Sequence, residues 1–323
     1  MPQGSLHIAD DEFFSAPFKT RDSLETPLMM AEKDAVVADL PRKVPVDVRA
    51  TLPLVFLRVA HTAVAVGVPL DKFGIVVAAD AVTGQVRVGR AVTPPVKRVE
   101  ESAPLADDGM SGEACLIDVR QQVDLPWRPA ELSVSLILRE QITEPLRVSL
   151  GYSPGAYRDE AVEAQKQKDL LAAPLPLIHP AGGTYGKDPA PEAVGLSLSA
   201  ERVVKLHADG PLTVKGSFRV KIPKHLFVDA KRGEALQLDP KPAALVPITL
   251  VITASKAPVP FVYDLVVPSW EADPKTGIAA GSFAVDLDKV GTVRTVPRTL
   301  FIYAFAGDQR FGPLPIGMQG EEE

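Results

Sequence analysis

Short stretches in which apolar and polar residues alternate recur along most of this chain. In residues 212–222 every second position is apolar or glycine, and the positions between are Thr, Lys, Ser or Arg. Residues 131–139 alternate in the same way over most of their length. The side chains of a strand point alternately to the two faces of its sheet, so a period of two predicts strands with one buried face. Such strands are typical of antiparallel sheets.

Turn residues separate these stretches and predict where strands end. Thr83-Gly84 lies between two apolar runs and predicts a hairpin, while Asp209-Gly210-Pro211 and Gly307-Asp308 predict later turns. Further strands are expected at residues 44–50, 54–68, 73–79, 85–92, 246–254, 261–267, 278–286 and 299–305. The chain is therefore expected to be mainly β.

Two regions of the chain share an order of features. Residues 112–118 lead past Pro129 to one alternating strand, and residues 281–286 lead past Pro297 to another. The two copies lie 168 or 169 residues apart. Chance similarity between strands bounded by Gly and Pro is the alternative. A true repeat would mean two tandem antiparallel β-sandwich domains, of the immunoglobulin-like or jelly-roll-like kind.

One helix is expected between the two halves. Residues 154–173 carry acidic side chains early and lysines late, which suits the helix dipole, and a Pro/Gly-rich stretch follows them. A shorter helix is expected within residues 28–40. The expected parts are an N-terminal arm (1–40), a first sandwich domain (41–152), the helix and linker (153–193), a second sandwich domain (194–317) and an acidic tail (318–323).

Composition supports this organisation and narrows the class of partner. The 323 residues suffice for two cores, and the 31 prolines favour many short strands over long helices. A net charge of −6 disfavours nucleic acid and anionic lipid, which need a basic surface. The single cysteine, Cys115, excludes an internal disulfide.

The sequence predicts neither a targeting signal nor a membrane span. The first 18 residues carry three acidic side chains and lack a basic start followed by an apolar core, so no secretory signal is expected. No uncharged apolar run approaches the length of a membrane span. A soluble, cytoplasmic protein is expected, with signal-less export as the alternative.

Residues 151–155, Gly-Tyr-Ser-Pro-Gly, form the one motif that looks catalytic. They fit the G-x-S-x-G pattern and so resemble the nucleophile elbow of the α/β-hydrolase family. The resemblance covers five residues and implies Ser153 as nucleophile. Asp188 with His207 or His225 would complete the order Ser, acid, His.

Physical arguments favour a structural interpretation of the same motif. The residue after the nucleophile donates its N–H to the oxyanion in an elbow, but Pro154 has none. Proline also restricts the backbone of Ser153, and no alternating helices follow to build a parallel sheet. Serine before proline is a helix-start signal, so Ser153 is predicted to cap the helix.

The remaining candidates are aromatic or acidic. Trp127 and Trp270 lie near strand ends and could form a platform for a carbohydrate or small ligand, although core or edge packing is the commoner use. Asp286 and Asp288 could hold a cation from one face of a strand, or protect a sheet edge from aggregation. The five histidines show no metal-ligand spacing, and no cofactor is expected.

Together these observations favour a non-catalytic protein that acts through its β-sheet surfaces, as an interaction partner or a structural scaffold. A protein partner or self-association is expected, without nucleic acid. A serine hydrolase that uses Ser153 is one alternative, and a carbohydrate or small-ligand binding module that uses Trp127 or Trp270 is the other.

Overall fold

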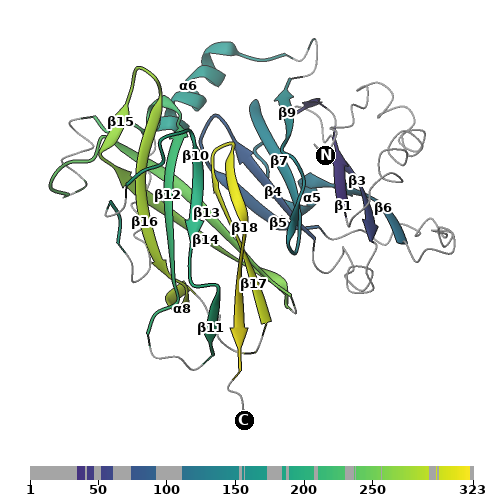
Figure 1. Cartoon of the computed structure of the whole chain (residues 1–323). Helices are drawn as coiled ribbons and strands as arrows, with labels where there is room; N and C mark the ends of the chain where they lie inside the picture. The colour runs from purple at the N-terminus through teal and green to yellow at the C-terminus, as the bar shows by residue number, and fades with distance from the viewer. Residues whose placement is uncertain are drawn as a thin grey trace. The chain divides into compact units, whose positions relative to one another are not determined.

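The protein is mainly β, as Figure 1 shows for this computed structural model. The structure describes residues 35–40, 42–46, 52–60, 74–91, 111–152, 155, 157–172, 184–186, 189–206, 210–229, 236, 238–255, 257–290, 296 and 298–320. The chain divides into two compact units. Unit 1 comprises Met1–Ala78 and Arg87–Ala156, and unit 2 comprises Ala79–Val86 and Tyr157–Glu323. The prediction of mainly β structure in several sheets is confirmed.

The first half of the chain supplies two sheets. The smaller has the order β1 (Ala35–Asp39), β3 (Pro53–Ala60) and β6 (Ser111–Asp118). The larger has the order β2 (Lys43–Pro45), β9 (Leu146–Gly151), β7 (Ala130–Leu138), β4 (Gly74–Asp80) and β5 (Val86–Arg90), with β8 (Gln141–Ile142) beside β7. A single helical turn, α5 (Val119–Gln122), follows β6 directly.

Two further sheets lie in unit 2. The smaller has the order β10 (Gly195–Ser199), β12 (Thr213–Lys221), β16 (Ile278–Asp286) and β15 (Glu271–Asp273). The larger has the order β11 (Val203–Lys205), β18 (Gln309–Gln319), β17 (Arg298–Ala306), β13 (Ala244–Ala254) and β14 (Ala257–Ser269). Short turns of helix, α8 (Leu287–Val290) and η1 (Lys224–Leu226), follow β16 and β12.

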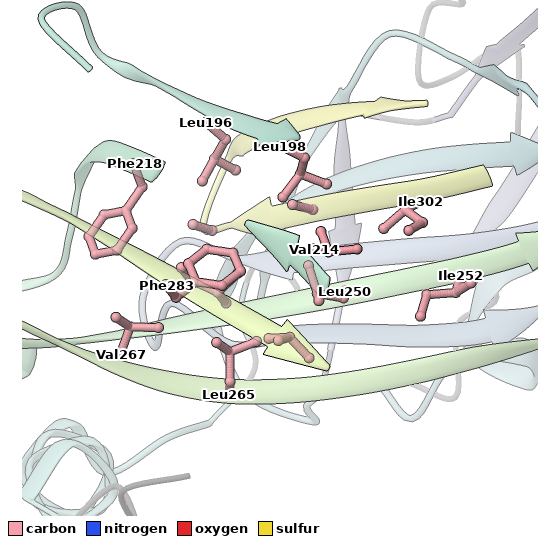
Figure 2. Packing of buried hydrophobic residues seen from close by; sticks show 14 of the residues in the cluster. Leu196, Leu198, Val214, Phe218, Leu250, Ile252, Leu265, Val267, Phe283 and Ile302 are labelled. Atoms are coloured by element: carbon pink, nitrogen blue, oxygen red, sulfur yellow. The ribbon is translucent and has the colours of Figure 1, made fainter. Parts of the chain in front are cut away.

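The core of unit 2 takes side chains from both of its sheets. Every second residue of β12 is buried, which confirms the alternation predicted for residues 212–222. Figure 2 shows side chains of the small sheet, such as Phe218 and Phe283, together with those of the large sheet, such as Leu250 and Ile302. Burying each such side chain is worth about 1.5–3 kcal/mol, so this layer stabilises the unit.

Two glycines give room for the aromatic rings of this core. Gly216 pairs with Phe283 across β12 and β16, and Phe218 pairs with Gly281 in the same ladder. A Cβ added at Gly216 would overlap the Phe283 ring, and one at Gly281 would lie 2.9 Å from Cζ of Phe218. Each ring therefore lies over the glycine of the opposite strand.

The core of unit 1 is built in the same way from aliphatic residues. Leu132, Val134, Leu136 and Leu138 of β7 are buried, as their alternation predicts. They belong to one cluster with side chains of the smaller sheet, including Leu54 and Ile117. Both sheets of the first half thus contribute to a single core.

The sheets are not wholly antiparallel, which corrects the prediction. β2 pairs with β9 in parallel, and β11 pairs with β18 in parallel. A parallel neighbour requires a long connection instead of a hairpin, and about a hundred residues separate β2 from β9. Alternation within a strand carries no information about such a partner, so the sequence could not show it.

Several strand boundaries also differ from the prediction. Residues 35–39 form β1 and pair with β3, so the helix expected within 28–40 is wrong there. β18 was missed because Pro313 and Pro315 argue against a strand. Pro315 pairs with Phe301 of β17, while Pro313 falls at a register irregularity of that pair, and β11 reaches no further than residues 317–319, so neither missing N–H group costs a bond to β11.

The predicted helix is α6 (Glu160–Ala172), and it begins later than expected. Asp159 caps it, since its Oδ1 accepts the N–H groups of Ala161 at 3.0 Å and Val162 at 3.2 Å. Ser153 therefore does not cap this helix, and it lies outside the described residues. α6 buries none of its side chains, so surface pairs such as Glu163–Lys166 support it instead of core packing.

Candidate binding site around Arg120 and Trp127

The site begins with the carboxylate that joins β6 to α5. Asp118 is the N-cap of α5, and its Oδ1 accepts the backbone N–H of Arg120 at 3.1 Å. The same oxygen accepts the N–H of Leu52 at 2.9 Å, while the Leu52 carbonyl accepts the N–H of Val119 at 2.8 Å. These bonds fix the turn that presents Arg120.

The loop between α5 and β7 carries Trp127 and is held from β5. Arg87 donates from Nη1 to the backbone carbonyl of Asp124 at 2.8 Å and to its carboxylate at 3.2 Å. Gly89 lies so close to the Gln122 carbonyl that an added Cβ would collide with it. β5 therefore sets the start of the loop through one arginine and one glycine.

Arg120 and Trp127 form a cation–π pair at the surface of unit 1. Cζ of Arg120 lies 4.3 Å from the centroid of the Trp127 ring. The Trp127 side chain is nevertheless 60% exposed, so only one face of the ring covers the guanidinium. An exposed tryptophan over an arginine brings together two residue types that are enriched at the energetic centres of protein interfaces.

The guanidinium of Arg120 is buried without an acceptor. Its Nε, Nη1 and Nη2 are all inaccessible to solvent, and none has a hydrogen-bond partner within the described part of the chain. Burial lowers the pKa of Arg120 from its ordinary value, and the nearby carboxylate of Asp118 opposes that shift. A buried charged donor without an acceptor is costly, so an acceptor brought to these nitrogens would relieve that cost.

Asp286 and Asp288 occupy the corresponding turn of unit 2, after β16. Asp286 Oδ1 accepts the N–H of Asp288 at 3.1 Å, and Asp288 Oδ2 accepts the N–H of Leu212 at 3.0 Å. Asp286 Oδ2 also lies 3.9 Å from Nζ of Lys289. Asp286 ends β16 and Asp288 lies in α8, so the two do not share one strand face as expected.

These contacts engage both carboxylates with the chain itself, and their use as a cation site stays a prediction. Among the residues that the structure describes, no group of three or more His, Cys, Asp or Glu side chains is placed to hold a metal ion.

Trp270 lies where the chain passes from β14 of the large sheet to β15 of the small one. Its Nε1 donates to the Pro240 carbonyl at 2.8 Å, and its ring stacks on Tyr185 with centroids 5.6 Å apart. The segment of Tyr185 pairs with β16 at Phe283. Trp270 thus uses its N–H and one ring face within the unit, which leaves less of it for a ligand than Trp127 has.

The catalytic candidates are not brought together by the described structure. Ser153, Asp188 and His207 lie outside the described residues, and His225 lies in η1. The hydrolase alternative therefore stays a prediction. No helix within the described ranges combines the length and the apolar character that a bilayer crossing needs.

Comparisons with known proteins give only weak similarities. The sequence matches no known protein family and no curated protein. Among solved structures, the C-terminal domain of the AgI/II polypeptide BspA from Streptococcus agalactiae is 9% identical with a TM-score of 0.17, over 88% of this chain and 100% of that one. A serine-rich repeat adhesion glycoprotein from Streptococcus agalactiae is 9% identical with a TM-score of 0.15, over 87% of this chain and 95% of that one. At such scores the fold rests on the strand pairing described above.

Proposed function

We propose that the chain consists of two tandem β-sandwich domains that arose by duplication. The strand order β1-β3-β6 in the first half matches β10-β12-β16 in the second. The order β2-β9-β7-β4-β5 likewise matches β11-β18-β17-β13-β14, and the parallel pair lies at the same end of each sheet. Agreement at this many pairings supports duplication over chance similarity between strands bounded by Gly and Pro.

Local contacts agree with the same duplication. Val119 donates to the Leu52 carbonyl at 2.8 Å, and Leu287 donates to the Leu212 carbonyl at 2.9 Å. In both units an aspartate that ends a strand accepts the N–H two residues later at 3.1 Å. Asp118 and Asp286 are the two aspartates, and their 168-residue spacing is that of the sequence repeat.

We propose that the protein is a non-catalytic interaction protein and that it binds a protein partner through the surface of Arg120 and Trp127. The observation that carries this proposal is the 60% exposure of a tryptophan that lies over an arginine whose guanidinium nitrogens are buried. An exposed aromatic ring offers a large apolar surface to a partner, and its contact with Arg120 lowers the side-chain entropy lost on binding. A cytoplasmic location is part of the same proposal.

Capture experiments with matched variants test this proposal. The full chain is immobilised as wild type, Trp127→Ala and Tyr157→Ala, and exposed to lysate from the source organism. Tyr157 is 99% exposed and serves as a control for the loss of a surface ring. Light scattering on the free protein measures self-association in parallel.

The proposal predicts a protein, or a second copy of this chain, that wild type and Tyr157→Ala retain and Trp127→Ala loses. Unchanged retention by Trp127→Ala would refute the assigned surface. A monomer that retains no protein at all would refute the interaction role as a whole.

A further inference from the structure

We infer that the Arg120–Trp127 site recognises a single carboxylate group on its partner. The inference rests on the proposed function, because it names the chemistry of the ligand at the surface assigned to partner binding. It starts from the three guanidinium nitrogens that are buried without an acceptor among the described residues.

A ligand at this site must accept hydrogen bonds from the N–H groups of the Arg120 guanidinium. A guanidinium carries five N–H groups in a planar fork, and a carboxylate accepts two of them side by side. Asp118 does not fill this role, because its Oδ1 already accepts two backbone N–H groups and no hydrogen bond joins it to the guanidinium. The guanidinium nitrogens of Arg120 therefore still lack an acceptor among the described residues.

The second step concerns the charge of the ligand. The carboxylate of Asp118 acts electrostatically to raise the pKa of Arg120, so the site already holds one negative group beside its one positive group. A dianionic phosphate would add twice the repulsion of a carboxylate from Asp118 at the same position. The local charge therefore favours a planar monoanion.

The third step concerns access. The Trp127 ring is the exposed member of the pair, and it lies in a loop between α5 and β7. The guanidinium nitrogens have no accessible surface, so a carboxylate reaches them only after the side chains over them, the exposed Trp127 ring included, move aside, and exposed side chains rotate rapidly. An acidic side chain that enters there gives up its hydrogen bonds to water and gains two charge-assisted hydrogen bonds and a contact with the ring.

The matching position in unit 2 shows that the turn itself does not require an arginine. The residue two positions after Asp286 is Asp288, which accepts the Leu212 N–H at 3.0 Å. In unit 1 Asp118 accepts the equivalent N–H of Leu52, so the side chain at position 120 is not needed for that bond. Arg120 is therefore available for recognition in unit 1 alone.

Fluorine NMR of the full chain labelled with 5-fluorotryptophan tests the inference. The sequence has two tryptophans, so two signals are expected, assigned with Trp127→Phe and Trp270→Phe. The probes are a glycine-rich, end-blocked peptide with one glutamate, the same peptide with glutamine, and inorganic phosphate, at equal ionic strength. The inference predicts a saturable shift of the Trp127 signal with the glutamate peptide, and a weaker response to phosphate.

Variants of Arg120 decide whether the guanidinium is the receptor. Arg120→Gln is expected to abolish the shift, and Arg120→Lys, which keeps the charge without the planar fork, is expected to weaken it. Circular dichroism and a Trp127 signal that stays at its wild-type position without peptide establish that unit 1 of each variant is folded. A Trp127 signal that the glutamate peptide leaves unmoved, or moves equally in Arg120→Gln, would overturn the inference.

The outcome is separable from that of the proposed function. If capture of a partner requires Trp127 but persists in Arg120→Gln, the interaction role stands and carboxylate recognition is wrong. If capture requires neither residue, the assigned surface itself is wrong.

Discussion

Replacing Gly216 with alanine should destabilise unit 2 selectively. The added methyl group would overlap the ring of Phe283, which is only 2% exposed and has no free space to enter. Overpacking of a filled core costs about 1–3 kcal/mol, and displacement of a buried phenylalanine forfeits part of about 1.5–3 kcal/mol of burial. We expect a loss of about 2–3 kcal/mol in the free energy of unfolding.

Urea denaturation followed by tryptophan fluorescence measures this loss. In a Trp127→Phe background the remaining tryptophan, Trp270, lies in unit 2 and reports that unit alone. The midpoint should fall while the slope m stays constant, which indicates a change in stability without a change in the exposed surface. Gly195→Ala is the control, because its added Cβ would meet nothing within 4 Å, and it should change stability by no more than about 0.5 kcal/mol.

A double substitution tests the assigned cause. Phe283→Leu removes the overlapping ring, so Gly216→Ala combined with Phe283→Leu should cost less than the sum of the two single changes, by about 0.5–3 kcal/mol. Strict additivity, or a Gly216→Ala variant as stable as wild type, would refute the packing of this ring on this glycine.

Four further outcomes are expected. Asp118→Ala should lower the free energy of unfolding of unit 1 by about 2 kcal/mol in urea, because two backbone N–H groups lose their acceptor. Gly89→Ala should lower it by more than about 3 kcal/mol in the same assay, because its Cβ meets a backbone carbonyl that cannot rotate away. The backbone N–H of Lys275 and a threonine hydroxyl hold the pKa of Asp273 below its ordinary value. This carboxylate therefore stabilises the fold at pH values above the ordinary carboxyl pKa, and the stabilisation is lost as the pH falls through the lowered pKa of Asp273. Asp273→Asn should remove this acid-side change in melting temperature. Ser153→Ala should leave the hydrolysis of an ester panel unchanged, because the proline after Ser153 offers no N–H to an oxyanion, and a serine-dependent rate would refute this.

The local apolar pattern located several strands, although of β12, β7 and β16 only β12 has one buried face, and the other two bury residues on both faces. β12, β7 and β16 lie within two residues of their predicted limits, because which residues face the core is a local property of each strand. The short strands β2 and β11 and their parallel pairing depend on partners more than a hundred residues away. Local pattern carries no such information, so these pairs could not be predicted.

The helix start shows how two valid local signals compete. Ser153-Pro154 and Asp159-Glu160 both suit the beginning of a helix, and the second is used. Gly155 lies between them with φ of +79°, a conformation outside the helical region. A glycine with this conformation interrupts any helix that starts before it, which explains the later start.

Of the two residues of the candidate site, only Trp127 was a candidate from the sequence. Trp127 was one of two tryptophans considered for ligand binding, although packing was the favoured interpretation of both, and it is 60% exposed. Arg120 was missed, because the burial of its guanidinium depends on the α5 turn and on a ring seven positions later. The signal that could have identified it is the proposed repeat, which would align Arg120 with Asp288.

Hydrogen–deuterium exchange of the full chain, resolved by peptide, tests the duplicated architecture most directly. The account predicts the same order of protection in both halves, with β7 and β17 exchanging most slowly, the edge strands β1 and β10 faster, and α6 fastest because it buries no side chain. Slow exchange in α6, or a fast-exchanging β7 beside a protected β17, would contradict two β units with equivalent cores.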